Sequence, residues 1–158
     1  MKVENKRILV LGMARSGIAA AELLLHHGAV PVLADNKPED AFGSDLDHLR
    51  GTACIFRLGE DPIALLDEAD ILLISPGVPI DAPIVKKAEM MRIPVLGEME
   101  MAARFIPCDM VALTGTNGKT TTTALLEHIL LQAGRTAKAC GNYGYPLCEL
   151  ALQPEQPE

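Results

Sequence analysis

The stretch RILVLGMARSGIAAAELLLHHGAVPVLAD, residues 7–35, contains two β-rich runs separated by a turn and a helical run. Residues 7–11 are apolar after the first, which is typical of a strand buried on both faces of a parallel sheet. Residues 16–27 repeat apolar side chains at helical spacing, and Gly28 follows where a helix C-terminal cap belongs. Residues 30–35 form the second β-rich run and close on an aspartate. This succession predicts a β-α-β unit.

The same alternation continues to residue 107. Further strands are expected at residues 54–58, 71–74 and 94–96, and short helices at residues 62–69, 83–91 and 98–105. The pattern predicts an α/β fold, a Rossmann-like doubly wound parallel sheet with right-handed crossovers.

After a short linker the pattern restarts. A strand is expected at residues 110–113, then a glycine turn, a helix over 119–133, a strand at 136–140 and a last short helix. We therefore predict a first domain over residues 1–107, followed over residues 108–158 by the incomplete start of a second α/β domain.

Composition excludes several classes of protein. A net charge of −7, with no basic stripe, argues against a nucleic-acid partner. No apolar run approaches the roughly 20 residues of a membrane span, and the N-terminus lacks a signal-peptide pattern, so we expect a cytoplasmic protein. The four cysteines have no metal-site spacing and are expected to be free thiols.

The first turn, GMARSG at residues 12–17, resembles the G-x-G-x-x-G phosphate fingerprint, with Ala14 at the second glycine. A helix N-terminus there offers free N–H groups to a diphosphate. Asp35 lies where an acidic residue usually meets the nucleotide, and Gly77 follows a later strand at the same sheet edge. A tight β-α turn without a ligand is the alternative.

The second turn, GTNGKT at residues 115–120, has the G-K-T core of a phosphate-binding loop, although Leu113 stands where the full pattern has glycine. Its successive N–H groups can surround a β-phosphate, and Lys119 can reach the β- and γ-oxygens. Thr120 is placed to ligate Mg²⁺, and Thr121 to contact a phosphate. A simple glycine turn does not explain the lysine and the run of threonines, because threonine is a mediocre helix former.

Five segments carry a family resemblance. They are VLGMARSGIAAAELLLHHGA (10–29), LLISPGVP (72–79), VLGEMEMAARF (95–105), ALTGTNGKTTTT (112–123) and GNYGYP (141–146). In order and spacing they resemble the Mur ligase family of bacterial cell-wall synthesis, and the first segment favours its D-glutamate-adding branch. The resemblance implies a UDP-binding first domain and the opening of a central ATPase domain.

The resemblance also implies roles for individual residues. The UDP part of the substrate would meet Gly12, Arg15, Ser16, Gly17, Asp35, Asn36 and Gly77. ATP would be held by Gly115, Thr116, Asn117, Gly118, Lys119, Thr120 and Thr121. The implied catalytic residues are Lys119 and Asn142, and the implied Mg²⁺ ligand is Thr120.

The implied reaction transfers the γ-phosphate of ATP to the carboxylate of UDP-N-acetylmuramoyl-L-alanine, and the amine of D-glutamate then attacks the acyl phosphate. By resemblance, the full-length enzyme would be a monomer. The metal-binding glutamate, the carbamylated lysine and the amino-acid site of the family would lie beyond residue 158, so we expect this chain to be inactive alone.

Three alternatives remain at this point. The chain could serve as a UDP-binding module without catalysis, or belong to another Mur ligase sibling. An NAD-dependent oxidoreductase is disfavoured, because that class leaves the second turn unexplained.

Overall fold

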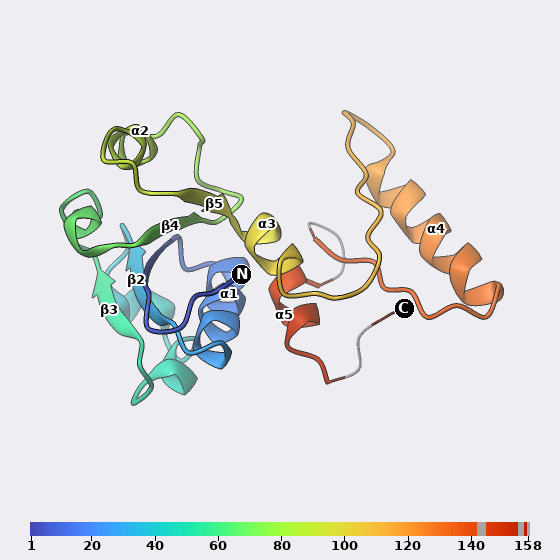
Figure 1. Cartoon of the computed structure of the whole chain (residues 1–158), viewed down its shortest axis with the longest axis horizontal. Helices are drawn as coiled ribbons and strands as arrows, with labels where there is room; N and C mark the ends of the chain where they lie inside the picture. Colours follow the sequence, from blue (N-terminus) through green and yellow to red (C-terminus); the bar gives the residue numbers. More distant parts are fainter. Residues whose placement is uncertain (142–144, 155–156, 158) are drawn as a thin grey trace.

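The computed structural model describes residues 1–141, 145–154 and 157. Its centre is a five-stranded parallel sheet of order β3-β2-β1-β4-β5 (Figure 1). The strands are β1 (Arg7–Leu11), β2 (Val30–Asp35), β3 (Ile55–Leu58), β4 (Ile71–Ile74) and β5 (Val95–Gly97). The predicted doubly wound parallel sheet is confirmed, and each predicted strand of the first 107 residues is found to within one or two residues.

Helices cover both faces of the sheet. The α-helices of the described chain are α1 (Arg15–His26), α2 (Pro83–Met90), α3 (Glu98–Ala103), α4 (Lys119–Gln132) and α5 (Leu147–Ala151). Three short 3-10 helices are η1 (Glu39–Phe42), η2 (Asp47–Leu49) and η3 (Ala64–Glu68). The helix expected at residues 62–69 is therefore the 3-10 helix η3. Among the described residues, no helix has the length and hydropathy that a membrane span requires.

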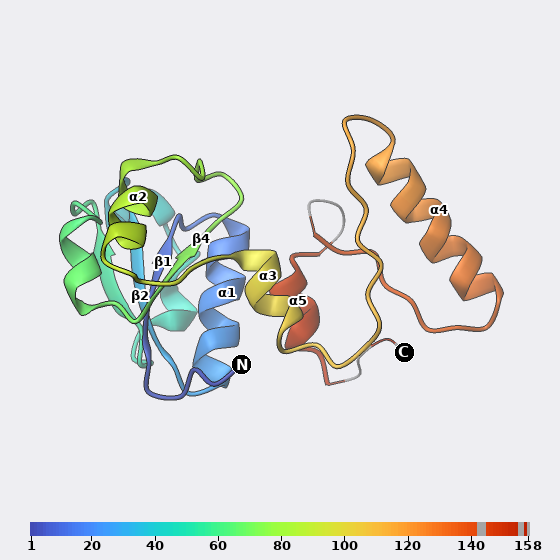
Figure 2. The same ribbon diagram turned by 45° about the horizontal axis from the view of Figure 1, so that its top comes forward.

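The central strand β1 is apolar on both sides because it separates two cores. Ile8 and Val10 belong to the core that contains α1 and α3, whereas Leu9 and Leu11 belong to the core that contains α2 and η3. Figure 2 shows α1 and α2 on opposite sides of the sheet. The alternation follows from the two-residue period of a strand.

The short helix α5 packs on this first unit although it comes late in the chain. Its residues Leu147, Cys148 and Leu150 are buried in the same core as α1 and α3. Figures 1 and 2 both place α5 beside α3.

Two predicted strands are not formed. Residues 110–113 have no regular structure, and residues 136–140 contribute only an isolated bridge between Cys140 and Tyr145. A strand needs a neighbour to bond its N–H and C=O groups, and no other described strand lies alongside residues 110–113. Their side chains are consequently exposed, including Val111 at 72%.

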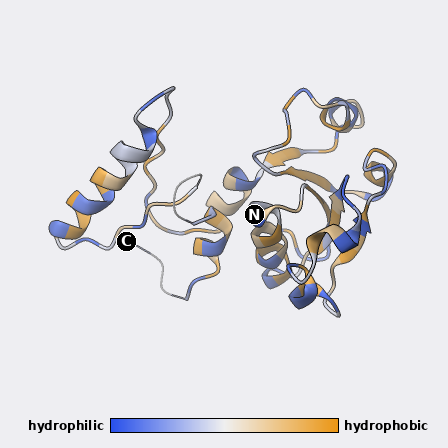
Figure 3. Cartoon of the chain, turned by 180° about the vertical axis from the view of Figure 1, so that it is seen from behind, coloured by the Kyte–Doolittle hydropathy of each residue, from blue (hydrophilic) through white to orange (hydrophobic). Residues whose placement is uncertain are grey.

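The helix α4 forms as predicted but stands apart from the sheet (Figures 1 and 2). None of its residues is buried. Figure 3 shows apolar positions on α4 outside the packed part of the molecule, and Leu125, Ile129 and Leu131 are each at least half exposed. The start of the predicted second domain is thus a helix without a sheet.

Candidate functional site: two phosphate turns

The first turn lies at the switch point of the sheet. Gly12 follows β1 and Ser75 follows β4, and these neighbouring strands lead to helices on opposite faces. Ligands of open α/β sheets bind at this carboxyl edge, where the direction of winding reverses. The Ser75 N–H donates to the Leu11 carbonyl at 3.1 Å, and its Oγ donates to the Gly12 carbonyl at 2.8 Å. The structure therefore brings the ends of β1 and β4 into contact.

Both outer glycines of this turn have a steric reason. Gly12 has a φ of +93°, and a Cβ on it would lie 3.2 Å from Ser75 Cβ. A Cβ on Gly17 would lie 1.9 Å from the Gly12 carbonyl oxygen, so the start of α1 can approach β1 only with glycine there. Gly77 differs, because a Cβ there would meet nothing within 4 Å.

The backbone N–H groups of residues 14–17 remain available. None of them donates to another described residue, whereas Gly12 N–H bonds to Ala34 O at 2.8 Å. The first turn of α1 contains no acidic side chain, and Ala14 at its N-cap forms no side-chain cap. Unpaired N–H groups at a helix N-terminus attract an anion. The geometry of this turn is therefore open to a phosphate.

The Asp35 carboxylate accepts hydrogen bonds from backbone N–H groups of the protein itself. One carboxylate oxygen accepts the Met13 N–H at 2.8 Å, and the other accepts the Lys37 N–H at 3.0 Å. These bonds connect the end of β2 to the first turn. The predicted neighbours Asn36 and Ser16 are exposed and partly exposed respectively, at the same edge of the sheet.

Arg15, predicted to meet the UDP diphosphate, is bound to α5. Its Nε donates to Glu149 Oε1 and a terminal nitrogen donates to Glu149 Oε2, both at 2.9 Å. Glu149 raises the pKa of Arg15 above its ordinary value, mainly through the side-chain hydrogen bond. Sequence reasoning missed Glu149, because the pair spans 134 positions and no local motif marks a partner that distant.

The buried carboxylate of Glu98 forms a second contact with α5. Glu98, at the start of α3, is 3% exposed, and its Oε1 accepts the Cys148 N–H at 3.1 Å. The burial of Cys148, together with the nearby carboxylate of Glu98, raises the pKa of its thiol far above the ordinary value. Cys148 is thus a structural thiol, in agreement with the expected free cysteines.

The second turn contains two glycines with positive φ and opens a helix. Gly115 and Gly118 have φ values of +145° and +78°, and α4 begins at Lys119. The N–H groups of residues 115–121 donate to no other described residue, and the first cap bond runs from Thr122 N–H to the Gly118 carbonyl. Both predicted turns therefore keep a run of N–H groups, at residues 14–17 and 115–121, that are unpaired within the described part of the chain.

Side chains of the second turn bond to backbone carbonyls of the protein itself. Lys119 Nζ donates to the carbonyls of Gly115 and Thr116, folding over its own loop. Thr123 Oγ1 donates back to the Lys119 carbonyl at 2.8 Å. The hydroxyls of Thr120 and Thr121 bond to no described residue. Asn142, predicted to be catalytic, lies outside the described residues.

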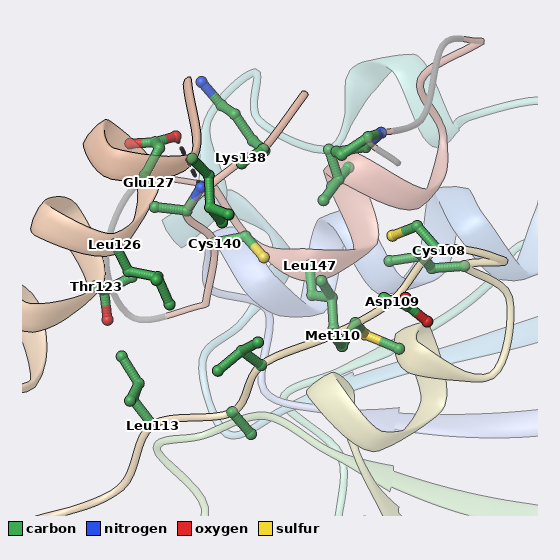
Figure 4. A pocket seen from close by; sticks show the side chains of 18 of the residues that line it. Cys108, Asp109, Met110, Leu113, Thr123, Leu126, Glu127, Lys138, Cys140 and Leu147 are labelled. Carbon is green, nitrogen blue, oxygen red and sulfur yellow. Dashed lines mark hydrogen bonds between the residues drawn. The ribbon is translucent and has the colours of Figure 1, made fainter. Parts of the chain in front are cut away.

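A cavity of about 490 Å³ adjoins the second turn (Figure 4). It lies between the segment 108–113, α4 and the segment 135–140, and Lys119 and Thr120 belong to its lining. Two residues of its lining are joined by a hydrogen bond, from the Ala139 N–H to Glu127 Oε1 at 2.8 Å (Figure 4). No hydrogen bond or ion pair between described residues joins this turn to the first one. Within the described chain, no three His, Cys, Asp or Glu residues are grouped to hold a metal ion.

Comparison with known proteins matches both halves of the chain. The model of the Mur ligase MurD-like N-terminal domain matches residues 6–97, and that of the Mur ligase middle domain matches residues 113–154. The chain is 39% identical to UDP-N-acetylmuramoylalanine--D-glutamate ligase of Thermoanaerobacter sp. (strain X514), over 97% of this chain and 34% of the relative. It is 42% identical to the enzyme of that name in Lactococcus lactis subsp. cremoris (strain MG1363), over 98% and 34%. The chain thus spans about a third of these relatives.

Solved structures share the fold. A murein peptide ligase from Psychrobacter arcticus aligns with a TM-score of 0.55 at 21% identity, over 82% of this chain and 27% of the other. UDP-N-acetylmuramate-alanine ligase from Thermotoga maritima aligns with a TM-score of 0.51 at 23% identity, over 84% and 30%. Together with the sheet order, the switch-point turn and the matched models, these findings show that the chain belongs to the Mur ligase family, with the N-terminal domain of its MurD-like branch.

Proposed function

We propose that this chain is the N-terminal part of a ligase that adds D-glutamate to UDP-N-acetylmuramoyl-L-alanine in peptidoglycan precursor synthesis. The observation that carries the proposal is the presence of two turns whose N–H groups, at residues 14–17 and 115–121, are unpaired within the described chain. Two such turns suit an enzyme that binds a sugar nucleotide and ATP together. The MurD-like match and the identity to D-glutamate ligases supply the substrate class.

In this proposal residues 1–107 bind the UDP part of the substrate. The N–H groups of residues 14–17 receive the diphosphate, and Arg15 and Ser16 add side-chain donors. Asn36 and Gly77 stand at the same edge for the nucleoside. Asp35 keeps the turn in shape through its bond from Met13 N–H, and its remaining lone pairs can accept from the nucleoside.

Residues 108–158 begin the ATP domain in this proposal. The second turn fits a nucleotide triphosphate, because its backbone donors are unpaired and its two glycines adopt positive φ. Lys119 would exchange the carbonyls of Gly115 and Thr116 for β- and γ-phosphate oxygens. The exposed Thr120 hydroxyl would hold Mg²⁺. ATP and Mg²⁺ together supply an activated phosphoryl group and offset its charge.

The chain's own residues would act by positioning charge. Lys119 would offset the negative charge that develops as the substrate carboxylate takes the γ-phosphoryl group from ATP, which gives an acyl phosphate and releases ADP. The D-glutamate amine then attacks the acyl carbon, and phosphate leaves as the amide forms. Asn142 is proposed to lie near the reacting carboxylate. The remaining machinery belongs to the part of the relatives that this chain does not span.

The test has two arms. The chain is first titrated calorimetrically with UDP, and micromolar to millimolar binding is expected, reduced in Arg15→Gln. It is then incubated with UDP-N-acetylmuramoyl-L-alanine, D-glutamate and Mg²⁺-ATP, and no ADP should form. ADP release that depends on D-glutamate would contradict the proposed inactivity of the chain alone, and the absence of UDP binding would contradict the substrate assignment.

A second candidate function is a UDP-binding module without an operating ATP site. The observation that favours it is that the rest of the protein packs against the first turn more closely than against the second. The first is built into the core beside β1 and β4, whereas the second opens a helix that has no buried residue. Titration with Mg²⁺-ATP distinguishes the two functions, because the module binds UDP but not ATP.

A further inference from the structure

Arg15 and Glu149 form a two-point ion pair at the mouth of the first turn. Both hydrogen bonds measure 2.9 Å, and the side chains are 63% and 27% exposed respectively. The guanidinium group also lies 5.9 Å from the centre of the Tyr145 ring. The N–H groups of Arg15 that donate to Glu149 are then not available to donate to a phosphate.

The surroundings of this pair are acidic. A hollow of about 360 Å³ beside the turn is lined by Met13, Ala14, Arg15, Ile18, Ala19, Glu22, Asp45 and Glu149. Among the described residues of that lining, Arg15 is the only basic side chain and three side chains are carboxylates. Glu22 has a partner of its own, His48, at 2.7 Å. Among the described residues of this lining, an anion that approaches the turn therefore meets Arg15 as its positive side chain, and Lys138 Nζ lies 4.9 Å from the centre of the Tyr145 ring that Arg15 also faces.

The position of Glu149 is set by contacts that do not involve Arg15. Leu147 and Leu150 are buried against α1 and α3, and Glu98 binds the Cys148 N–H. Residue 149 is therefore held beside the turn by contacts of α5 other than its pair with Arg15.

We propose that Glu149 sets the anion affinity of the first turn, because a diphosphate bound at residues 14–17 must compete with Glu149 for the Arg15 side chain. This inference rests on the proposed function, in which that turn holds a diphosphate. The exchange is feasible because the pair is exposed, and exposed pairs are weak. A diphosphate offers more charge and more acceptor oxygens than one carboxylate, so it can displace Glu149 from Arg15. The competition lowers the affinity of the turn for the diphosphate.

The test compares Glu149→Gln with Glu22→Gln in calorimetric titrations of the whole chain with UDP. Both variants remove one negative charge from the same hollow, but only the first releases Arg15. Glu149→Gln should tighten UDP binding about two- to five-fold, the range that an exposed ion pair can supply. Glu22→Gln should change it by less than about half of that. An unchanged or weakened affinity in Glu149→Gln overturns the proposal.

A double variant separates competition from simple repulsion. In an Arg15→Gln background, Glu149→Gln should no longer tighten binding, because no guanidinium is left to release. An equal gain in both backgrounds would mean that Glu149 only repels the anion, and would overturn the proposal. If no variant binds UDP, the proposed substrate fails, and the same titrations with inorganic pyrophosphate test the competition alone. Failure of pyrophosphate to bind overturns it as well.

An NMR measurement on the unaltered chain gives a result that does not depend on whether the variants fold. The ¹⁵N NMR signal of Arg15 Nε is assigned by its absence in Arg15→Gln. Saturating UDP should shift this signal, since the Nε–H must leave Glu149 for phosphate. A signal that stays in place while UDP binds would show that Arg15 never leaves Glu149, and would overturn the proposal.

Discussion

Gly17 and Gly77 both belong to the proposed UDP site, but the space around them differs. A Cβ on Gly17 would lie 1.9 Å from a backbone oxygen, whereas a Cβ on Gly77 would touch nothing within 4 Å. Gly17→Ala should therefore lower the free energy of unfolding by about 1–3 kcal/mol or more, the usual cost of overpacking. Gly77→Ala should stay within about 1 kcal/mol of the unaltered chain. Urea unfolding of the two variants checks this, and equal losses would contradict the crowding at Gly17.

His27 supplies a pH-dependent contribution to stability. Its ring stacks on Phe105 with centroids 4.1 Å apart. Burial, and to a lesser degree the neighbouring His26, lowers its pKa below the ordinary value. The unfolded chain therefore binds more protons than the folded chain between the folded pKa and about 6.5. The stabilisation is complete above that window and is lost as the pH falls through it.

Replacing this ring by a similar one that cannot ionise should reduce the pH dependence. His27→Phe keeps a ring against Phe105 but removes the titration. Urea unfolding at about pH 7.5 and about pH 5.5, on either side of the ordinary histidine pKa, should show a smaller loss of stability in His27→Phe than in the unaltered chain. Equal losses in the two proteins would show that His27 titrates as it does in the unfolded chain.

The two helices of the last 50 residues differ in how much they contribute to the fold. Leu147 of α5 is 5% exposed in the core shared with α1 and α3, whereas Leu125 of α4 is 56% exposed. Leu147→Ala should cost about 2–5 kcal/mol, the range for a buried leucine, and Leu125→Ala less than about 0.5 kcal/mol. Thermal and urea unfolding compare the pair. A large loss in Leu125→Ala would mean that α4 is covered in solution.

The elements of this chain differ in how well the sequence predicts them. The strand at residues 7–11 and the helix that follows it were predictable, because periodicity and a glycine cap act over a few residues. The prediction of a strand at residues 110–113 was wrong. The apolar pattern is a local property of the sequence, whereas a strand also needs hydrogen bonds to a neighbouring strand, which can come from a distant part of the chain. The docking of α5 was not foreseen, since it depends on contacts with α1 and α3. The glycines indicated the positions of the two turns, whose binding of phosphate stays a prediction, whereas the bond between Arg15 and Glu149 depends on the docking of α5.

The chain as a whole combines one packed unit with one helix that projects from it. The core of the first unit includes α5, so an element from beyond the domain boundary expected between residues 107 and 108 packs into this unit. Between α3 and α5 the chain runs through residues 110–140, where most side chains are exposed. Stability should therefore be unevenly distributed, with local opening in α4 far easier than in α1.

Amide hydrogen exchange tests this distribution directly. A single helix of 14 residues is marginal in water without tertiary packing, and the threonines at the start of α4 favour helix less than alanine or leucine do. Amides of α4 should exchange orders of magnitude faster than those of α1, whose residues Ala20, Leu23 and Leu24 are fully buried. The exchange is measured by mass spectrometry at two protein concentrations. Protection of α4 that rises with concentration would show that copies of the chain cover its apolar side chains, and protection equal to that of α1 at the lower concentration would contradict the projecting helix.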